Sequence, residues 1–225
     1  MRRKMNNAIL AYYQAIKSGA VVVGRWVELI YERIITMLER KEVVFDQIKA
    51  NRAIDYIETH CFHTEGELAP SPLKLELWQK AFVSCIFGIV DETGRRQFRE
   101  VVLLVGRKNG KSALAAAIAK YIWLTEGGYG TRVYCLAPKL EQADIIYNGV
   151  WQMMLLDPNY QDELAKANEK NQHNKRINDA SMLPLHRQSD MAVLGTNSTV
   201  KKIAFSAKRS DGFNPSLTLC DEIAA

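Results

Sequence analysis

Long apolar segments are missing from this sequence of 225 residues. Its best apolar runs are Ala81–Val90 and Ala113–Leu124, both well short of the about 20 residues that cross a membrane, and Lys120 interrupts the second. The basic start, Met1–Lys4, is followed by an amphipathic helical pattern and not by the apolar core of a secretion signal. We therefore expect neither a membrane protein nor a secreted one.

Cysteine is scarce, and no CxxC pair is present. The four cysteines stand in apolar surroundings, which predicts buried, reduced thiols in a cytosolic protein: Cys61, Cys85, Cys135 and Cys220. His60 and His63 flank Cys61, but no second group of His and Cys lies within reach in the sequence. We therefore do not expect a zinc site.

The apolar and aromatic content, 48% and 9%, is sufficient for a folded core and argues against disorder. The net charge of +5 is unevenly distributed, since the stretch from Lys166 to Arg209 holds nine Lys and Arg against three Asp and Glu. A basic stretch of this kind indicates a polyanionic partner such as nucleic acid. Charge alone is equally compatible with a solvated polar segment.

The pattern of apolar residues changes near residue 98. Residues 1–60 and 73–90 have helical periodicity, and a turn-rich connector, 61–72, separates them. Beyond residue 98, apolar runs predict strands at 101–105, 132–137, 203–205 and 217–220, with helices at 111–124 and 140–155. This alternation predicts an α/β fold with a parallel sheet. We divide the chain into an N-terminal helical segment, 1–72, and an α/β domain, 73–225.

The segment between the first predicted strand and the Ala-rich helix has the composition of a phosphate-binding loop, or Walker A motif. It consists of Gly106, Arg107, Lys108, Asn109, Gly110, Lys111 and Ser112. Small residues let backbone N–H groups surround a phosphate, and the helix N-terminus adds its positive end. In such a loop Lys111 reaches the β- and γ-phosphates of ATP and Ser112 ligates Mg²⁺. The spacing is a variant, because GxxxxGK[ST] places its first glycine at Val105.

A second motif, typical of Walker B, ends the last predicted strand with Asp221 and Glu222. Ligands of open α/β sheets bind at this edge, where Asp221 would belong to the Mg²⁺ shell and Glu222 would activate the attacking water. Arg107, inside the loop, is a candidate for stabilising charge on the γ-phosphate. The alternatives are a solvent-facing acidic strand end and an exposed cation.

The loop pattern [G/S]-R-x-x-G-K-[S/T] resembles that of the large subunits of tailed-phage terminases, the ATPases that pump DNA into procapsids. Four further stretches, at 77–80, 88–112, 137–143 and 211–222, are similar to the same family, so the resemblance spans most of residues 10–225. It implies that Gln79 reads the adenine edge, although a plain helix-surface amide is the alternative. It also implies an arginine presented to a neighbouring subunit, with Arg209 a nearer candidate than Arg176.

The resemblance implies a P-loop NTPase of the additional-strand, RecA-like class that hydrolyses ATP with Mg²⁺ to translocate double-stranded DNA. The implied partners are the portal protein, the terminase small subunit and further copies in a ring. The implied location is the cytoplasm of the bacterial host and not the mature virion.

The family continues into a nuclease domain, whereas this sequence ends three residues after Glu222. We therefore expect no nuclease activity and an incomplete sheet, as in a truncated piece, an interrupted gene or a prophage remnant. Two alternatives are another helicase-like P-loop NTPase and a non-catalytic remnant that binds only nucleotide or DNA. The intact set of Lys111, Ser112, Asp221 and Glu222 favours the catalytic interpretation.

Overall fold

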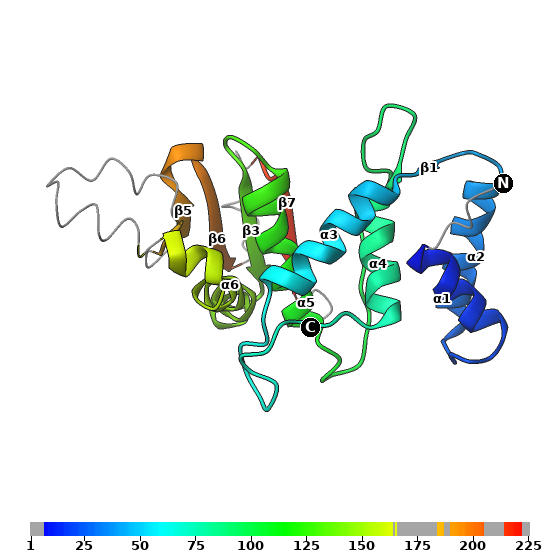
Figure 1. The fold of residues 1–225 in the computed structure, drawn as a ribbon, viewed down its shortest axis with the longest axis horizontal. Helices are drawn as coiled ribbons and strands as arrows, with labels where there is room; N and C mark the ends of the chain where they lie inside the picture. Colours follow the sequence, from blue (N-terminus) through cyan, green and yellow to red (C-terminus); the bar gives the residue numbers. More distant parts are fainter. Residues whose placement is uncertain (1–6, 164, 166–183, 187–189, 205–213, 222–225) are drawn as a thin grey trace, which may run out of the picture. The chain divides into compact units, whose positions relative to one another are not determined.

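The computed structural model describes residues 7–163, 165, 184–186, 190–204 and 214–221. The chain forms two compact units, the first from residues 1–58 and 74–104 and the second from residues 59–73 and 105–225 (Figure 1). The predicted domain division at residues 72 and 73 adjoins one of these breaks, and as a division by function it stays a prediction. No helix in the described part of the chain is long and apolar enough to span a membrane.

The first unit is mainly helical, as the periodicity of residues 1–60 and 73–90 predicted. Its elements are α1 (Ala8–Lys17), α2 (Arg25–Glu39), β1 (Val44–Phe45), most of α3 (Gln47–His60), α4 (Leu77–Gly88) and β2 (Ile89–Val90). The short strands β1 and β2 pair antiparallel. The predicted helix at the end of this unit therefore stops at Gly88, and its last two residues form β2.

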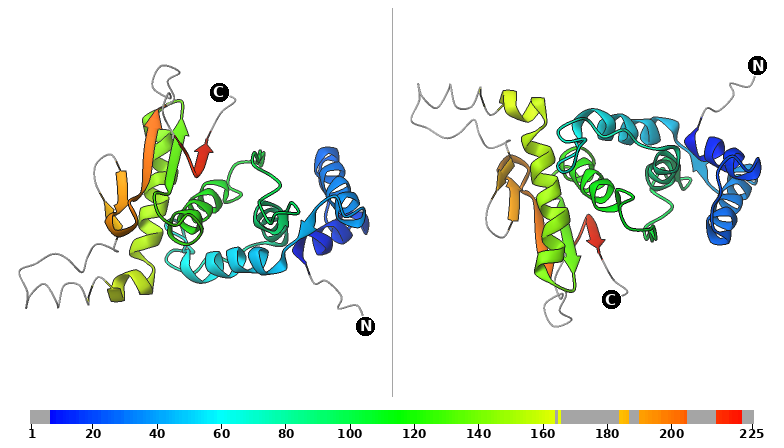
Figure 2. Two further views of the ribbon diagram at one scale, coloured as in Figure 1. Left: turned by 90° about the horizontal axis from the view of Figure 1, so that it is seen from above. Right: turned by 90° about the horizontal axis from the view of Figure 1, so that it is seen from below.

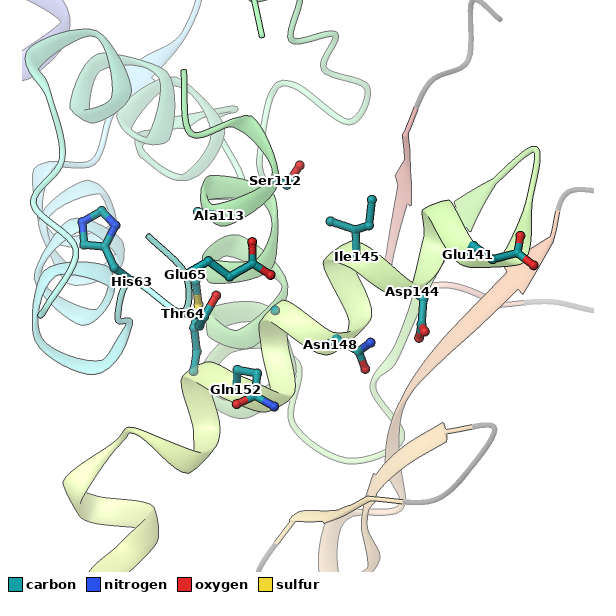
Figure 3. A pocket seen from close by; sticks show the side chains of 12 residues that line it. His63, Thr64, Glu65, Ser112, Ala113, Glu141, Asp144, Ile145, Asn148 and Gln152 are labelled. Carbon is teal, nitrogen blue, oxygen red and sulfur yellow. The ribbon is translucent and has the colours of Figure 1, made fainter. Parts of the chain in front are cut away.

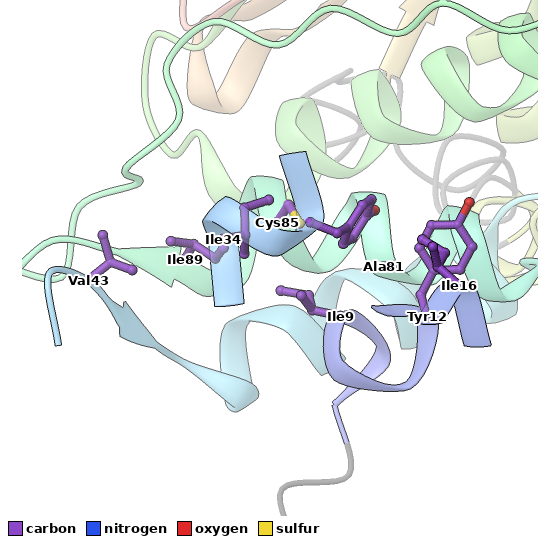
Figure 4. Close-up of a cluster of buried hydrophobic side chains, with 9 residues drawn as sticks. Ile9, Tyr12, Ile16, Ile34, Val43, Ala81, Cys85 and Ile89 are labelled. Atoms are coloured by element: carbon purple, nitrogen blue, oxygen red, sulfur yellow. The ribbon is translucent and has the colours of Figure 1, made fainter. Parts of the chain in front are cut away.

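Helices α1, α2 and α4 enclose the core of the first unit (Figure 4). Its buried side chains are Ile9, Tyr12, Ile16, Tyr31, Ile34, Val43, Ala81, Cys85 and Ile89. Tyr12 and Tyr31 meet edge to face with ring centroids 4.9 Å apart, the arrangement that aromatic quadrupoles favour. At the end of α4 a Cβ on Gly88 would lie 2.7 Å from the Phe45 ring, so this close approach requires glycine.

The second unit is built on a five-stranded sheet in the order β4-β5-β6-β3-β7 (Figure 2). The strands are β3 (Arg132–Ala137), β4 (Pro184–His186), β5 (Asp190–Val193), β6 (Ser198–Ala204) and β7 (Leu217–Cys220). β3 pairs parallel with both β6 and β7, whereas β4, β5 and β6 pair antiparallel. The predicted α/β class is confirmed, but the sheet is mixed and not wholly parallel.

Two helices of the second unit pack on this sheet. α6 (Leu140–Leu155) packs against β3 and β6, and α5 (Lys111–Tyr121) packs along α6 and contacts β7. A Cβ on Gly149 would lie 3.1 Å from the Cβ of Ala116, so the two helices approach closely where their residues are small. The predicted helix 111–124 is α-helical to Tyr121 and continues as a π-helical turn, Ile122–Glu126.

The apolar run 101–105 is not a strand, so this prediction is wrong. Val102 is 88% exposed and Leu104 is 94% exposed. An apolar run becomes a doubly buried strand only when neighbouring strands hydrogen-bond to it and helices cover both faces. Among the described residues no strand pairs with this run, and apolar composition alone does not supply that environment.

A buried ammonium group joins three segments of the second unit. Lys120 on α5 is fully buried, and its Nζ donates to the backbone oxygens of His60 and Met153 and to Asp157 Oδ2, the last at 2.8 Å. Asp157 Oδ1 lies 3.4 Å from His60 Nδ1 and accepts the N–H of Asn159. A charge in the interior is tolerated when it is paired and its donors are satisfied. The three acceptors meet that condition and tie α5 to the end of α6 and to the last residue of α3.

Replacing this ammonium is expected to destabilise the fold. Lys120→Met leaves the Asp157 carboxylate buried without the cation, which costs about 3–5 kcal/mol. The double variant Lys120→Met/Asp157→Leu removes both charges and is expected to recover most of that loss. Urea denaturation followed by circular dichroism gives the free energy of unfolding of the unaltered chain, of Lys120→Met and of the double variant. Equal stability of the unaltered chain and Lys120→Met would contradict this account of the network.

Candidate functional site

The loop before α5 has the backbone geometry of an anion-binding site. Lys108 and Gly110 have positive φ values of 64° and 71°, which turn successive N–H groups toward a common concave side. Gly110 is the N-cap of α5, and no side chain caps this end of the helix. The N–H groups of the first turn, which form the positive end of the helix dipole, therefore have no capping side chain as an acceptor. The predicted phosphate loop therefore has local geometry suited to a phosphate.

Asn109 braces this loop internally. Its Nδ2 donates to the backbone oxygens of Gly106 at 3.1 Å and Arg107 at 3.2 Å. A Cβ on Gly106 would lie 3.3 Å from the same nitrogen, so the bracing is tight. The Arg107 and Lys108 side chains are exposed. Asn109 thus shapes the loop, a structural role in addition to the phosphate-binding role that the sequence predicted for it.

The structure brings Lys111 and Asp221 into contact across 110 residues of sequence. The Lys111 Nζ and Asp221 Oδ1 atoms lie 2.7 Å apart, with the two side chains 38% and 11% exposed. Lys111 opens α5, and Asp221 follows β7, whose Cys220 pairs with Leu136 of β3. The Asp221 N–H also donates to the Leu136 oxygen at 2.9 Å. One residue from each predicted motif, Lys111 and Asp221, therefore lies beside the other in the second unit.

A pocket of about 340 Å³ opens beside the next residue, Ser112 (Figure 3). Ser112 and Ala113 line it from α5 and residues 63–65 from the connector, while α6 contributes Glu141, Asp144, Ile145, Asn148, Gly149, Gln152 and Met153. Asp144 is held by Lys202, 2.6 Å away, whose Nζ also lies 4.9 Å from the centre of the Tyr147 ring. The volume lies within the range of small-molecule sites, but the lining is mostly polar, whereas such sites are lined predominantly by apolar side chains.

Ser112 and Asp221 offer oxygen ligands of the kind that Mg²⁺ prefers. Within the described residues no group of three or more His, Cys, Asp or Glu side chains could hold a metal ion. Mg²⁺ in nucleotide sites is typically bound by one or two protein oxygens together with phosphate oxygens and water. The donor set thus fits Mg²⁺ that arrives with a nucleotide and does not fit an all-protein metal cage.

Gln79 lies in the first unit, in the first turn of α4. Its Oε1 accepts the N–H of Glu76 at 2.9 Å and completes a capping box with that residue. The amide therefore has a structural use, and its predicted contact with adenine stays a prediction. Glu222, Arg209 and Arg176 lie outside the described residues, so their predicted roles also remain predictions.

The buried-thiol prediction is confirmed for three cysteines and wrong for the fourth. Cys61, Cys85 and Cys135 are buried, and burial raises the pKa of each thiol to about 12. Cys220 is exposed because β7 lies at the edge of the sheet formed by the described strands, and its side chains alternate between half-buried and exposed positions.

Comparison with known proteins points to one family. The family model described as the ATPase domain of the terminase large subunit matches residues 77–225. The large subunit of the terminase of Enterobacteria phage HK97 is 30% identical over 115 residues, which is 51% of this chain and 22% of that protein. The crystal structure of the HK97 bacteriophage large terminase superposes with a TM-score of 0.55 and 24% identity, covering 76% of this chain and 30% of that one. The chain thus spans less than a third of these relatives.

Cys220 is expected to be the reactive thiol of the folded chain. Partial burial raises its pKa, so the thiolate fraction is low at neutral pH and labelling by iodoacetamide accelerates as the pH rises. A short pulse of reagent followed by peptide mass spectrometry, at neutral and at alkaline pH, measures this. Cys220→Ser serves as the control and should remove the signal. Equally fast labelling of Cys85 or Cys135 would contradict the burial assigned to them.

Proposed function

The chain belongs to the ATPase domain family of terminase large subunits, and on that premise we propose that it binds and hydrolyses ATP with Mg²⁺ at the start of α5. The observation that carries the proposal is the 2.7 Å contact between Lys111 and Asp221 beside an uncapped helix N-terminus. In this proposal Lys111 is the phosphate-binding cation, the first-turn N–H groups of α5 are further donors to the phosphate, and Asp221 is a carboxylate of the metal shell. We assign the sheet to the additional-strand class of P-loop NTPases.

Each residue of the site has a stated part in this proposal. The loop N–H groups and Lys111 bind the β- and γ-phosphates, while the pocket beside Ser112 offers room for the rest of the nucleotide. Ser112 and Asp221 hold Mg²⁺, which when bound neutralises charge on the phosphate oxygens. Arg107 stabilises charge on the γ-phosphate, and Glu222 takes the proton from the attacking water.

For the whole protein we propose that ATP hydrolysis drives translocation of double-stranded DNA into procapsids in the cytoplasm of the bacterial host. Its partners would be the portal protein, the small subunit and further copies in a ring. The excess of nine basic over three acidic residues between Lys166 and Arg209 supports a polyanionic partner. Family membership supports the proposed translocation, the other partners and the location. The experiments that follow test ATP binding and hydrolysis by this chain.

Calorimetric titration with ATP and Mg²⁺ tests the phosphate site. Lys111→Ala is expected to weaken binding by about a hundredfold, equivalent to about 2.7 kcal/mol, because it removes a charge-assisted contact. Glu222→Gln should retain binding and abolish release of inorganic phosphate. Lys108→Asn is the matched control, since it removes a loop lysine while keeping a residue type that accepts positive φ. Similar losses in Lys111→Ala and Lys108→Asn would refute the assignment of Lys111.

Discrimination between ATP and GTP tests the assignment of Gln79. If Gln79 reads adenine, Gln79→Ala lowers the preference for ATP by about tenfold, the effect of losing one specific hydrogen-bonding group in a base site. Glu76→Ala breaks the same capping box and provides the control for helix stability. Competition between the two nucleotides gives the ratio for each chain. If Gln79→Ala and Glu76→Ala show the same preference for ATP over GTP, Gln79 acts only in the capping box and does not read adenine.

A further inference from the structure

Helix α2 has a second apolar face, on the side opposite the core of the first unit. Tyr31 and Ile34 of this helix are buried in that core (Figure 4). Trp26, Leu29 and Ile30, by contrast, are 77%, 41% and 55% exposed. Their spacing of three and four residues places them together on one side of the helix, as an apolar stripe. Exposed apolar surface of this kind marks a site of interaction with another protein surface.

Charged residues accompany this stripe in an order that complements its own reverse. Arg25 and Glu32 are both exposed, and because they are seven residues apart they lie on the same flank of the helix. Arg33 is also exposed and follows Trp26 by seven residues, so it extends the stripe itself. We propose that a second copy of this chain covers the stripe, with the two α2 helices antiparallel and their Leu29 side chains face to face.

Opposite charges meet in this arrangement. Because a helix rises about 1.5 Å per residue, residues whose numbers sum to about 58 lie opposite each other in an antiparallel pair centred on Leu29. Arg25 of each copy is then displaced by only about 1.5 Å along the axis from Glu32 of the other copy. A parallel pair would instead align Arg25 with Arg25 and Glu32 with Glu32, so the charges favour the antiparallel arrangement.

Trp26 gains a cationic neighbour in the same arrangement. It lies beside Arg33 of the other copy, and a guanidinium over an indole face is a favourable cation–π contact. Within one chain Arg33 pairs with Glu42 at 3.1 Å, with the two side chains 59% and 36% exposed. An ion pair at the surface contributes little free energy, so it does not prevent the guanidinium from turning toward the indole.

The proposed contact uses the same surface on both copies and therefore closes after two chains. A ring requires head-to-tail contacts between different surfaces, so this pairing is separate from the ring of the proposed function and goes beyond it. One pair of helices covers a small area compared with stable dimer interfaces. We therefore expect a dissociation constant of about 1–100 µM.

Sedimentation velocity of the full chain, from about 1 to 300 µM, tests the pairing across the expected range. We expect a monomer–dimer equilibrium that is lost in Leu29→Lys, which places two ammonium groups face to face at the centre of the contact. Ile48→Lys is the matched control, since Ile48 is an 80% exposed apolar residue of α3 in the same unit, and it should dimerise like the unaltered chain. An unaltered chain that stays monomeric overturns the proposal, and so does undiminished dimerisation of Leu29→Lys.

Exchange of the flanking charges tests the antiparallel register. Arg25→Glu leaves two carboxylates on the flank of each helix and should weaken dimerisation by about tenfold or more. Arg25→Glu/Glu32→Arg should restore it, because each charge again meets an opposite one in the antiparallel pair. A double variant as weak as Arg25→Glu would overturn the proposed arrangement. Far-ultraviolet circular dichroism confirms that the variants compared are folded.

Discussion

The parallel pairing of β7 with β3 is the constraint on which the site depends. β7 has four residues, and the described strands place only β3 beside it. Hydrogen bonds extend this ladder at both ends, from the Ser216 N–H to the Arg132 oxygen and from the Asp221 N–H to the Leu136 oxygen. A slip of one residue would turn the Asp221 side chain to the opposite face. The register of β7 against β3 therefore determines on which face of the sheet the Asp221 carboxylate lies.

The two lysines of α5 show how one helix carries two different kinds of cation. Lys111, in the first turn, is partly exposed and forms an ion pair with Asp221. Lys120, in the last turn, is fully buried and is satisfied by two backbone oxygens and Asp157. Because a helix is stiff over this length, anchoring its far end limits where its first turn can lie. The buried network around Lys120 therefore helps to fix the position of Lys111 at the start of the same helix.

The features predicted well from sequence are those set by local pattern. The bounds of β3, β7 and α6 agree with the predicted ones, since their apolar runs and turn residues suffice to define them. The run 101–105 failed because a strand also depends on neighbours that composition does not specify. The β4–β5 pair was missed because strands of three and four residues are too short to show a clear alternation of apolar and polar residues. In the sequence Lys120 only interrupts an apolar run, and its ion pair with Asp157 could not be predicted because no local pattern connects the two residues.

The two units interleave along the chain, and this affects the order in which they can be completed during synthesis. All segments of the first unit have been made once residue 104 is added, whereas residues 59–73 of the second unit precede most of their partners. Within that early segment, His60 must wait for Lys120 and Asp157 before its contacts can form. Domains generally fold as units as the chain emerges. The second unit is thus completed after the first, and its residues do not form one uninterrupted stretch of the sequence.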